Sequence, residues 1–349
     1  MTDIHPHTAV IILNWNGKKY LDQFLPLLIK YTTRPGTELV VADNGSSDGS
    51  VQFLKKAFPG IRLIPFPRNY GFAAGYNRAI EATEAEYIVL LNSDVEVTPG
   101  WLDPLIGLLE HDPDVAACMP RIRSWHRRDH FEYAGAAGGF IDRWGYPFCR
   151  GRILNHIESD AGQYDEERDI FWATGACMAV RRSIYLEAGG LDERFFAHME
   201  EIDLCWRIKN MGYRIIYQPL STVYHVGGGS LPNEHPHKLY LNFRNNLLTL
   251  CKNLPRGKRG LTIFIRTCLD TLAALKYLFT RQPANALAVF RAYGGFMRRL
   301  KHCRNERKRW LARYRLNDHA EIYRGSILIQ FFLRKKKTFS ELKFPGETS

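Results

Sequence analysis

The amino-acid sequence predicts an α/β protein with a central, mostly parallel sheet between helices and a basic helical extension at its C-terminal end. Two observations predict the sheet. Over the first 120 residues short apolar runs alternate with longer amphipathic segments, and the runs are apolar on both faces, as buried parallel strands are. The third observation is charge: residues 1–250 contain 25 Lys and Arg against 30 Asp and Glu, whereas residues 251–349 contain 23 against 6.

The elements expected in the first 120 residues alternate in type. Strands are expected at Thr8–Leu13, Glu38–Ala42, Ile61–Pro65, Tyr87–Leu91 and Val115–Met119. Helices are expected at Lys18–Tyr31, Ser50–Phe58, Gly75–Thr83 and Pro99–Glu110. Thr98 is the expected N-cap of the last helix, with Pro99 at its first position. Pro26 and Pro104 lie inside two of these helices and predict a kink or a later start.

The later part of the chain is at first less regular. Residues 120–170 are rich in Arg, Gly, Tyr and Trp with little periodicity, which predicts long loops and a few short strands. The segment Phe171–Val180 then predicts a glycine-containing turn that enters a strand, and Glu200–Lys209 predicts a helix that ends at Gly212. From Leu239 onward the pattern is helical and increasingly basic.

Cysteine usage and hydropathy predict a reducing compartment and no membrane span. The seven cysteines are scattered and include no CxxC pair, so neither a disulfide framework nor a zinc site is indicated. The apolar run Ala9–Leu13 is too short for the core of a signal peptide. The most apolar later stretch, Leu261–Phe279, is interrupted by Arg266, Asp270 and Lys276 and should not cross a bilayer. We expect a cytoplasmic protein.

Polar side chains follow each of the first four expected strands. The segments are Asn14-Trp15-Asn16-Gly17, Asp43-Asn44-Gly45-Ser46-Ser47-Asp48-Gly49-Ser50, Arg68-Asn69-Tyr70-Gly71 and Asn92-Ser93-Asp94. Ligands of open α/β sheets bind beyond the carboxyl ends of the strands, so these segments mark the expected site. None of them contains the glycine fingerprint of dinucleotide-binding proteins or the P-loop motif, which indicates a different kind of nucleotide site.

Asn92, Asp94 and His225 are candidates for a metal site. Asn92 and Asp94 end a rigid strand and, two residues apart in extended chain, point the same way. Such oxygen ligands suit Mg²⁺ or Mn²⁺ that is already bound to phosphates. His225 follows a β-like run, and a neutral imidazole there could complete the metal shell. The alternatives are a simple turn at residues 92–94 and a hydrogen-bonded structural histidine.

Asp43 is a candidate for binding a nucleobase. It ends the second expected strand and begins a donor-rich loop that leads into a helix. A carboxylate at this place could accept the imide N–H of a pyrimidine, while the loop amides lie near sugar or phosphate oxygens. The alternative is that Asp43-Asn44-Gly45 is only a turn and that Ser46 or Ser47 only caps the helix.

Acidic residues also gather at the start of the helix expected from Glu200. Glu200, Glu201 and Asp203 could be explained by the helix dipole, and Asp203 with Arg207 is an ordinary pair at a spacing of four. The aromatic residues before this helix and the aliphatic residues within it favour partial burial instead, which would hold a carboxylate at a cleft.

These clusters occur in the order and context of a known family. The motifs are Ile11-Ile12-Leu13-Asn14-Trp15-Asn16, the segment 43–50, Asn69-Tyr70-Gly71-Phe72-Ala73-Ala74-Gly75-Tyr76-Asn77, Leu91-Asn92-Ser93-Asp94, Thr174-Gly175-Ala176, Gly189-Gly190-Leu191-Asp192-Glu193-Arg194-Phe195-Phe196 and Glu200-Glu201-Ile202-Asp203-Leu204-Cys205-Trp206-Arg207. The sequence resembles the inverting family 2 glycosyltransferases of the GT-A fold, specifically the bacterial rhamnosyltransferase-like branch that builds surface polysaccharides. The resemblance covers residues 7–250 and is specific as a set of motifs.

The resemblance implies a role for each motif. It implies a GT-A catalytic domain over residues 1–250, with a nucleotide-sugar-binding half at 1–120 and an acceptor and catalytic half at 121–250, before the extension at 251–349. On the donor side it implies Asp43 as the nucleobase-binding acid, together with Asn14, Asn69, Asn77 and Asn92. Asp94 is the implied metal-binding acid, with His225 as a second ligand because Asn92 stands where the family has an acid. The implied acceptor residues are Trp172, Thr174, Gly175 and Ala176. Glu201 stands at the position of the catalytic base, and Glu200 remains an alternative.

The activity implied by the resemblance is inverting transfer of a sugar from a nucleotide-diphosphate donor to a hydroxyl of a lipid-linked saccharide acceptor, with Mg²⁺ or Mn²⁺. Rhamnose from a dTDP donor follows from the branch, and galactose, glucose and N-acetylglucosamine from UDP stay open. One rival is a sugar-nucleotide nucleotidyltransferase, but the sequence lacks a basic, glycine-rich loop after the first strand. A nucleic-acid-binding protein would leave the acidic clusters unexplained, so no nucleic-acid partner is expected.

The basic extension predicts an association with anionic lipid. Residues Arg291 to Leu316 contain ten Lys and Arg and one acid, Glu306, interleaved with Leu300, Trp310, Leu311 and Tyr314. A basic amphipathic helix of this type lies on anionic membranes, which would place the protein at the inner face of the cell membrane. The alternative is that these helices pack on the catalytic domain and turn their charges to water.

Overall fold

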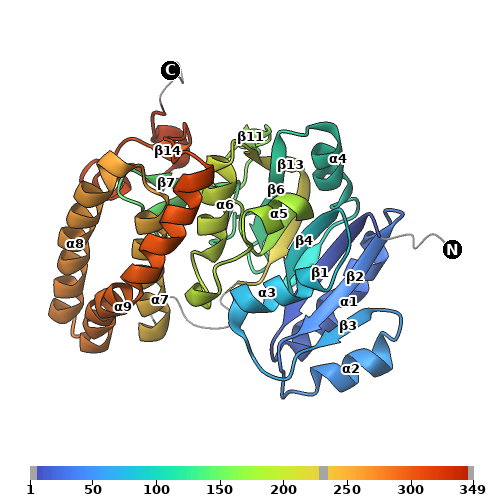
Figure 1. Ribbon diagram of the computed structural model, residues 1–349. Coiled ribbons are helices and arrows are strands. Elements are labelled where there is room, and N and C mark those ends of the chain that lie inside the picture. The colour runs from blue at the N-terminus through green and yellow to red at the C-terminus, as the bar shows by residue number, and fades with distance from the viewer. Residues whose placement is uncertain (1–5, 228–234, 345–349) are drawn as a thin grey trace.

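The structure is a computed structural model that describes residues 6–227 and 235–344. It contains a nine-stranded sheet flanked by helices, a smaller five-stranded sheet, and a layer of three long helices at the end of the molecule away from β3 (Figure 1). The predicted α/β class is confirmed.

The large sheet has the strand order β11-β13-β6-β12-β4-β1-β2-β3, with β5 paired to β13. Its strands are β1 (Thr8–Asn14), β2 (Thr37–Asp43), β3 (Arg62–Pro65), β4 (Tyr87–Asn92), β5 (Val95–Val97), β6 (Val115–Ser124), β11 (Arg168–Asp169), β12 (Cys177–Arg181) and β13 (Arg214–His225). β1, β2, β3 and β4 are parallel to one another, and β6 is parallel to β13. β12 lies antiparallel to both β4 and β6, so the sheet as a whole is mixed.

The register of the parallel strands brings the predicted site residues to one level of the sheet. Asn14 pairs with Asp43 across β1 and β2, and Leu13 pairs with Asn92 across β1 and β4. Because parallel strands end at the same edge, the polar residues that follow β1, β2 and β4 meet there.

The helices around the sheet are α1 (Lys18–Tyr31), α2 (Ser50–Ala57), α3 (Gly71–Glu81), α4 (Asp103–His111), α5 (Arg182–Glu187) and α6 (Glu200–Asn210), with a short 3₁₀ turn at Glu193–Phe195. α1 continues through Pro26 without a break, and α3 begins at Gly71, earlier than predicted.

The predicted cap of α4 is wrong. Thr98 does not cap a helix, because its hydroxyl donates to the backbone oxygen of Thr222 at 2.7 Å and ties β5 to β13. Residues 99–102 form a turn instead, and the helix starts at Asp103 with Pro104 in its first turn. The later start that Pro104 predicted is therefore confirmed.

The second sheet joins the middle of the chain to its C-terminal part. It consists of β7 (Gly139–Asp142), β8 (Pro147–Cys149), β9 (Arg152–Ile153), β10 (His156–Ile157) and β14 (Ile322–Tyr323). β14 pairs in parallel with β7, and the short helical turns Ile329–Leu333 and Phe339–Glu341 follow it. The ring centres of Phe339 and Phe344 lie 4.8 and 5.3 Å from that of Phe140, so the end of the described chain packs into the same core as β7.

Three helices form the layer beside α6: α7 (Pro236–Asn253), α8 (Arg256–Phe279) and α9 (Pro283–Arg313) (Figure 1). Within residues 6–227 and 235–344, no helix has the length and the apolar content that crossing a bilayer requires.

A buried charge network joins α6 to α7. The Asp203 carboxylate is fully buried and accepts bonds from Arg207 Nε at 3.0 Å, Lys252 Nζ at 2.8 Å and Asn253 Nδ2 at 2.7 Å. Lys252 also donates to Asp192 at 2.8 Å, on the loop that precedes α6. Asp203 is therefore a structural residue. The sequence had left this role open, because Asp203 and Arg207 form an ordinary pair at a spacing of four.

We predict that Asp203→Ala lowers the free energy of unfolding by about 3–5 kcal/mol, because Arg207 and Lys252 would be left buried without their shared anion. Chemical denaturation measures this change. Asp318→Ala is the control, since Asp318 pairs with Lys258 on the surface and its loss should change the free energy of unfolding by less than about 1 kcal/mol. Similar losses in the two variants would contradict the network's structural role.

Candidate functional site

Hydrogen bonds fix the loops at the ends of β1 and β2. Asn14 Nδ2 donates to Asp43 Oδ2 at 2.9 Å and to Ser46 Oγ at 3.2 Å, while Asp43 Oδ1 accepts the backbone N–H of Ser46 at 2.9 Å. Asn14 and Asp43 are both buried. Each carboxylate oxygen of Asp43 already accepts one bond from the protein, so this side chain shapes the loop at the strand ends.

Asn44 links the loop after β2 to the loop after β3. Its side-chain amide donates to Asn69 Oδ1 at 3.1 Å and to the Gly71 carbonyl at 3.0 Å, and its oxygen accepts from the Tyr70 N–H at 2.9 Å. At Gly45 a Cβ would come within 2.5 Å of the Arg68 backbone, so glycine is needed for this approach. Asn69 thus lies beside the Asp43 loop, as the motifs implied, and Asn44 is a positioning residue that the sequence did not single out.

Asp94, His225 and Glu132 meet at the ends of β4 and β13. His225 Nε2 lies 3.2 Å from Asp94 Oδ1, and His225 Nδ1 lies 3.1 Å from Glu132 Oε2. The predicted pair of Asp94 and His225 is brought together, although 131 residues separate them in the chain. Glu132 was missed, because it stands alone in an irregular segment and carries no motif.

The positive charge of His225 and the negative charges of Asp94 and Glu132 stabilise one another. Burial acts to lower the pKa of His225, but the carboxylates of Glu132 and Asp94 raise that pKa well above its usual value. Burial acts to raise the pKa of Asp94, and the His225 imidazolium outweighs it and lowers that pKa. The same balance lowers the pKa of Glu132. The three side chains therefore form a charged group, with a histidine between two carboxylates.

The group fits a cation that shares its shell with a substrate. Histidines that bind metals usually donate their second ring N–H to a carboxylate, which is the place that Glu132 takes beside Nδ1. Among the described residues, no three His, Cys, Asp or Glu side chains are grouped to hold a metal ion by themselves. A cation would take the place of the proton on His225 Nε2, so that Asp94 and the neutral imidazole would supply two ligands, and phosphate oxygens and water the others.

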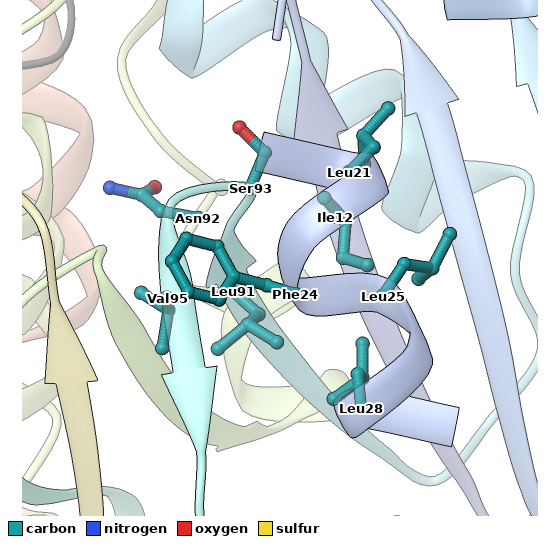
Figure 2. Close-up of a pocket in the computed structure, with 9 residues that line it drawn as sticks. All are labelled: Ile12, Leu21, Phe24, Leu25, Leu28, Leu91, Asn92, Ser93 and Val95. Carbon is teal, nitrogen blue, oxygen red and sulfur yellow. The ribbon is translucent and has the colours of Figure 1, made fainter. Parts of the chain in front are cut away.

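Asn92 and Ser93 lie at the edge of a small apolar pocket between α1 and β4 (Figure 2). Their polar ends point away from the leucine and phenylalanine side chains that line it. A second pocket lies between α2 and the strands β2 and β3. Neither pocket is lined by Asp43, Asp94 or Glu201.

The loop that leads into α6 has an unusual backbone. Phe196, His198 and Met199 all have φ near +70°, a region that side chains other than glycine rarely adopt. Asn245 Nδ2 on α7 donates to three carbonyls of this loop, those of Phe195, Ala197 and His198, at 2.8–3.1 Å. The tertiary structure therefore holds the start of α6 in a conformation that the loop would not keep alone.

Further bonds hold the same loop from both sides. Arg244 donates to the carbonyls of Arg194 and Phe195 at 3.1 and 2.9 Å. From the other side, the Phe72 N–H in the first turn of α3 donates to the Phe196 carbonyl at 2.8 Å. The loop thus connects the donor-side helix α3 to α6.

Glu200 and Glu201 occupy the first turn of α6, and each has a buried Oε2 atom without a hydrogen-bond partner. Burial raises the pKa of Glu201 to about 7. Burial and the neighbouring Glu201 raise the pKa of Glu200 well above its usual value. Glu201 can therefore change its protonation state near neutral pH, and burial together with Glu201 favours the neutral form of Glu200.

The predicted acceptor residues Thr174, Gly175 and Ala176 lie in one loop that contacts both the end of β4 and helix α6. The Asn92 N–H at the end of β4 donates to the Ala176 carbonyl at 3.0 Å, and the Ala173 N–H donates to Cys205 Sγ on α6 at 3.4 Å. Cys205 lies four residues after Glu201, so both are on the face of α6 that meets this loop. Residues 173–176 thus connect the strand end that leads to Asp94 with the helix that carries Glu201.

Two predicted binding residues, Trp172 and Asn77, make contacts within the protein. Trp172 is buried and its indole N–H donates to the Phe140 carbonyl at 2.9 Å, so its ring packs in the core against Gly139. Asn77 accepts from Tyr185 Oη at 2.6 Å and donates to the Leu191 carbonyl at 2.8 Å, which holds the loop before α6. Thr174 and Gly175 remain at the acceptor loop, with Gly175 close to the Phe72 ring.

Residues 9–188 match the family model described as glycosyl transferase family 2. The chain is a family 2 glycosyltransferase. It is 31% identical over 243 residues to N-acetylglucosaminyl-diphospho-decaprenol L-rhamnosyltransferase of Mycobacterium tuberculosis, a match that covers 64% of this chain and 76% of that protein. It is also 23% identical over 246 residues to the low-salt glycan biosynthesis hexosyltransferase Agl10 of Haloferax volcanii, covering 69% of this chain and 74% of that one.

Solved structures confirm that this glycosyltransferase has the GT-A fold. GalNAc-T7 with UDP, GalNAc and Mn²⁺ aligns with a TM-score of 0.56 and 16% identity, over 74% of this chain and 49% of that one. Staphylococcus aureus TarS 1–349 in complex with UDP-GlcNAc aligns with a TM-score of 0.53 and 15% identity, over 87% and 89%. The rival predictions of a nucleotidyltransferase and of a nucleic-acid-binding protein are not supported.

We predict that Asn245→Ala lowers kcat of the glycosyltransferase about 10- to 100-fold, because small displacements of catalytic groups have effects of this size. Steady-state assays with wild-type and variant enzyme measure it. Asn246→Ala is the matched control: Asn246 is equally buried on α7, but its amide donates to the Gly145 carbonyl, away from the loop before α6. Equal kcat losses in both variants would show that general destabilisation, and not loop position, is responsible.

Proposed function

We propose that the enzyme transfers a sugar from a nucleoside-diphosphate donor to a hydroxyl of a lipid-linked saccharide, with inversion at the anomeric carbon. The observation that carries the proposal is the loop 173–176, which contacts the end of β4 near Asp94 and the face of α6 that holds Glu201. On the β4 side of this loop, Asp94 would help to bind the donor diphosphate. On the α6 side, the Glu201 carboxylate would act on the acceptor hydroxyl.

The donor would bind at the ends of β1, β2 and β4. Asp43 and Asn14 organise the loop 44–49, whose backbone and hydroxyl groups precede the N-terminus of α2. Asn69 holds the neighbouring loop, and the half-exposed Trp15 follows the end of β1, where it offers an aromatic surface. In this arrangement Asp43 fixes the base-binding loop, and Asn92 lies two residues before the diphosphate site.

Asp94 and His225 would hold the divalent cation, with Glu132 orienting the imidazole. When bound, Mg²⁺ or Mn²⁺ neutralises the charge that develops on the departing diphosphate. GalNAc-T7 was solved with UDP and Mn²⁺, which supports a cation and a sugar nucleotide in this fold. The residues of this chain position the donor and keep the buried carboxylates paired.

Glu201 would act as the general base. Its carboxylate removes the proton of the acceptor hydroxyl while the oxygen attacks the anomeric carbon and the bond to the diphosphate breaks, so one displacement inverts that centre. A pKa of about 7 suits this task, because the carboxylate is both present and basic at neutral pH.

The acceptor class is proposed from the relatives. The Mycobacterium tuberculosis relative is by its name a rhamnosyltransferase that acts on a decaprenol-linked saccharide. A lipid-linked acceptor would place this enzyme at the inner face of the cell membrane, for which its basic C-terminal segment is suited. L-Rhamnose is the sugar that we propose first.

We predict that Glu201→Gln lowers kcat about 100- to 10,000-fold without weakening donor binding, because an amide cannot take the proton. Wild-type activity should rise as the pH increases through about 7, since a raised pKa leaves Glu201 protonated and inactive below that value. Product formation from dTDP-rhamnose and the UDP sugars across the pH range measures both effects.

Glu200→Gln is the matched control for that experiment. Burial and the neighbouring Glu201 raise the pKa of Glu200 and so favour its neutral form, which glutamine reproduces, and most of the activity should remain. Full turnover by a folded Glu201→Gln enzyme would refute Glu201 as the base, and loss of activity only in Glu200→Gln would transfer the role to Glu200.

We predict that Glu132→Gln raises the Mn²⁺ concentration needed for half-maximal activity about 10- to 100-fold, as expected when the carboxylate partner of a metal-binding histidine is lost. A titration of activity with Mn²⁺ tests this. Glu158→Gln is the control, because Glu158 is also buried but accepts bonds from Tyr164 and Phe339. An unchanged Mn²⁺ requirement in Glu132→Gln would remove Glu132 from the site.

A further inference from the structure

Helix α8 buries three polar side chains and exposes six large apolar ones. Thr262, Arg266 and Asp270 face the protein, together with Ala274. Its large apolar side chains are exposed instead, with Phe279 at 86% and Leu272 at 61% of full exposure. The exposed set on α8 is Leu261, Phe264, Leu272, Leu275, Leu278 and Phe279. This is the reverse of the usual orientation of an amphipathic helix.

Polar contacts from other elements fix this orientation. Asp270 is fully buried, pairs with Arg266 at 3.0 Å, and accepts bonds from Tyr146 Oη at 3.2 Å and Tyr293 Oη at 2.9 Å. The Arg266 guanidinium also lies 3.8 Å from the centre of the Tyr146 ring. Rotating α8 to bury its leucines would expel these groups, so the apolar face is held outward by specific bonds.

The exposed residues form one continuous stripe. Leu261, Phe264, Cys268, Leu272, Leu275 and Phe279 follow one another at spacings of three and four, which places them along one face of the helix. Leu287, Phe290 and Met297 on α9 are exposed as well. α8 lies at the end of the molecule, with α7 and α9 between it and the sheet (Figure 1). Stable proteins rarely expose a large contiguous apolar patch without a partner.

The charges near the stripe are basic. The only acids in residues 256–313 are the buried Asp270 and the partly buried Glu306. Exposed cations on these two helices and in the turn between them include Lys276, Arg281, Arg291 and Arg298. Two copies packed through this stripe would bring like charges together, whereas an anionic lipid surface would neutralise them.

The basic second half of α9 does not present an apolar face of this kind to solvent. Leu300 and Trp310 pack against the protein core, and Tyr314 Oη donates to Glu187 at 2.5 Å. The apolar side chains of Arg291–Leu316 that were expected to enter lipid are therefore mostly turned toward the catalytic domain. The surface suited to lipid lies on α8 and the first turns of α9.

We propose that α8 and the start of α9 lie in the interface of an anionic membrane, with the apolar stripe below the headgroups and the flanking lysines and arginines against the phosphates. The inference deepens the proposed function by naming the surface that brings the enzyme to a lipid-linked acceptor. The biological role of this surface rests on the proposed function, but membrane binding itself does not. Vesicle binding needs neither donor nor acceptor, so it can fail or succeed independently of sugar transfer.

Cys268 provides a direct test, because it lies within the stripe and is the exposed one of the seven cysteines. A polarity-sensitive thiol dye on the full-length protein should show blue-shifted emission and protection from iodide with vesicles of phosphatidylglycerol and phosphatidylcholine. Phosphatidylcholine alone should give neither effect. An unshifted, fully quenched dye with the anionic vesicles would overturn the proposal, and so would a shift that depends on protein concentration without lipid.

A double variant and a control variant test the apolar stripe without a dye. Leu272→Glu/Phe279→Glu should weaken sedimentation with the anionic vesicles by about tenfold or more, because two inserted side chains become charged. Leu220→Glu is the control, since Leu220 is 80% exposed at β13 in the catalytic domain. All these side chains are exposed, so thermal melting should not change. Equal binding by wild-type protein and the double variant would contradict the role of the stripe.

Discussion

The position of α6 depends on polar side chains supplied by α7. Lys252 and Asn253 bind the buried Asp203 inside α6, and Asn245 binds the carbonyls of the loop before it. A buried carboxylate is stable only with its partners in place, so the two helices cannot shift independently. The three left-handed residues of the loop are held in the same way. The first turn of α6, with Glu200 and Glu201, is thus fixed before any substrate arrives.

The strand ends that would bind the donor and the first turn of α6 differ in how far their polar groups are hydrogen-bonded. At the strand ends Asn14 Nδ2 donates to Asp43, and Asn44 Nδ2 donates to Asn69 on the neighbouring loop, which makes a rigid edge for a nucleotide although the buried Asn14 Oδ1 has no partner. In the first turn of α6, Glu200 and Glu201 keep buried oxygens without partners. Unsatisfied buried carboxylates destabilise a fold, and such exceptions occur where function requires a perturbed pKa. The rigid surroundings make this local instability tolerable.

Much of the fold could be predicted from the sequence, because β1, β2 and β4 are apolar on both faces and each ends in a polar motif. Asp94 and His225, which the family resemblance paired, lie 3.2 Å apart in the structure. Glu132 was not found, since an isolated acid in a segment without periodicity carries no local signal. Trp172 and Asn77 were placed in the site because their motifs lie there, but their polar atoms bind the protein backbone. For α8, the sequence showed charges within an apolar stretch but not which side faces inward. Tyr146 and Tyr293, distant in the chain, decide that.

The most direct measurement is a crystal structure of the enzyme with a nucleoside-diphosphate sugar and Mn²⁺, with the metal located by anomalous scattering. We expect the anomalous peak between the Asp94 carboxylate and Nε2 of His225, with Glu132 against Nδ1 and the sugar facing Glu201. A peak held by other residues, or a donor bound away from the ends of β1, β2 and β4, would contradict the proposed site.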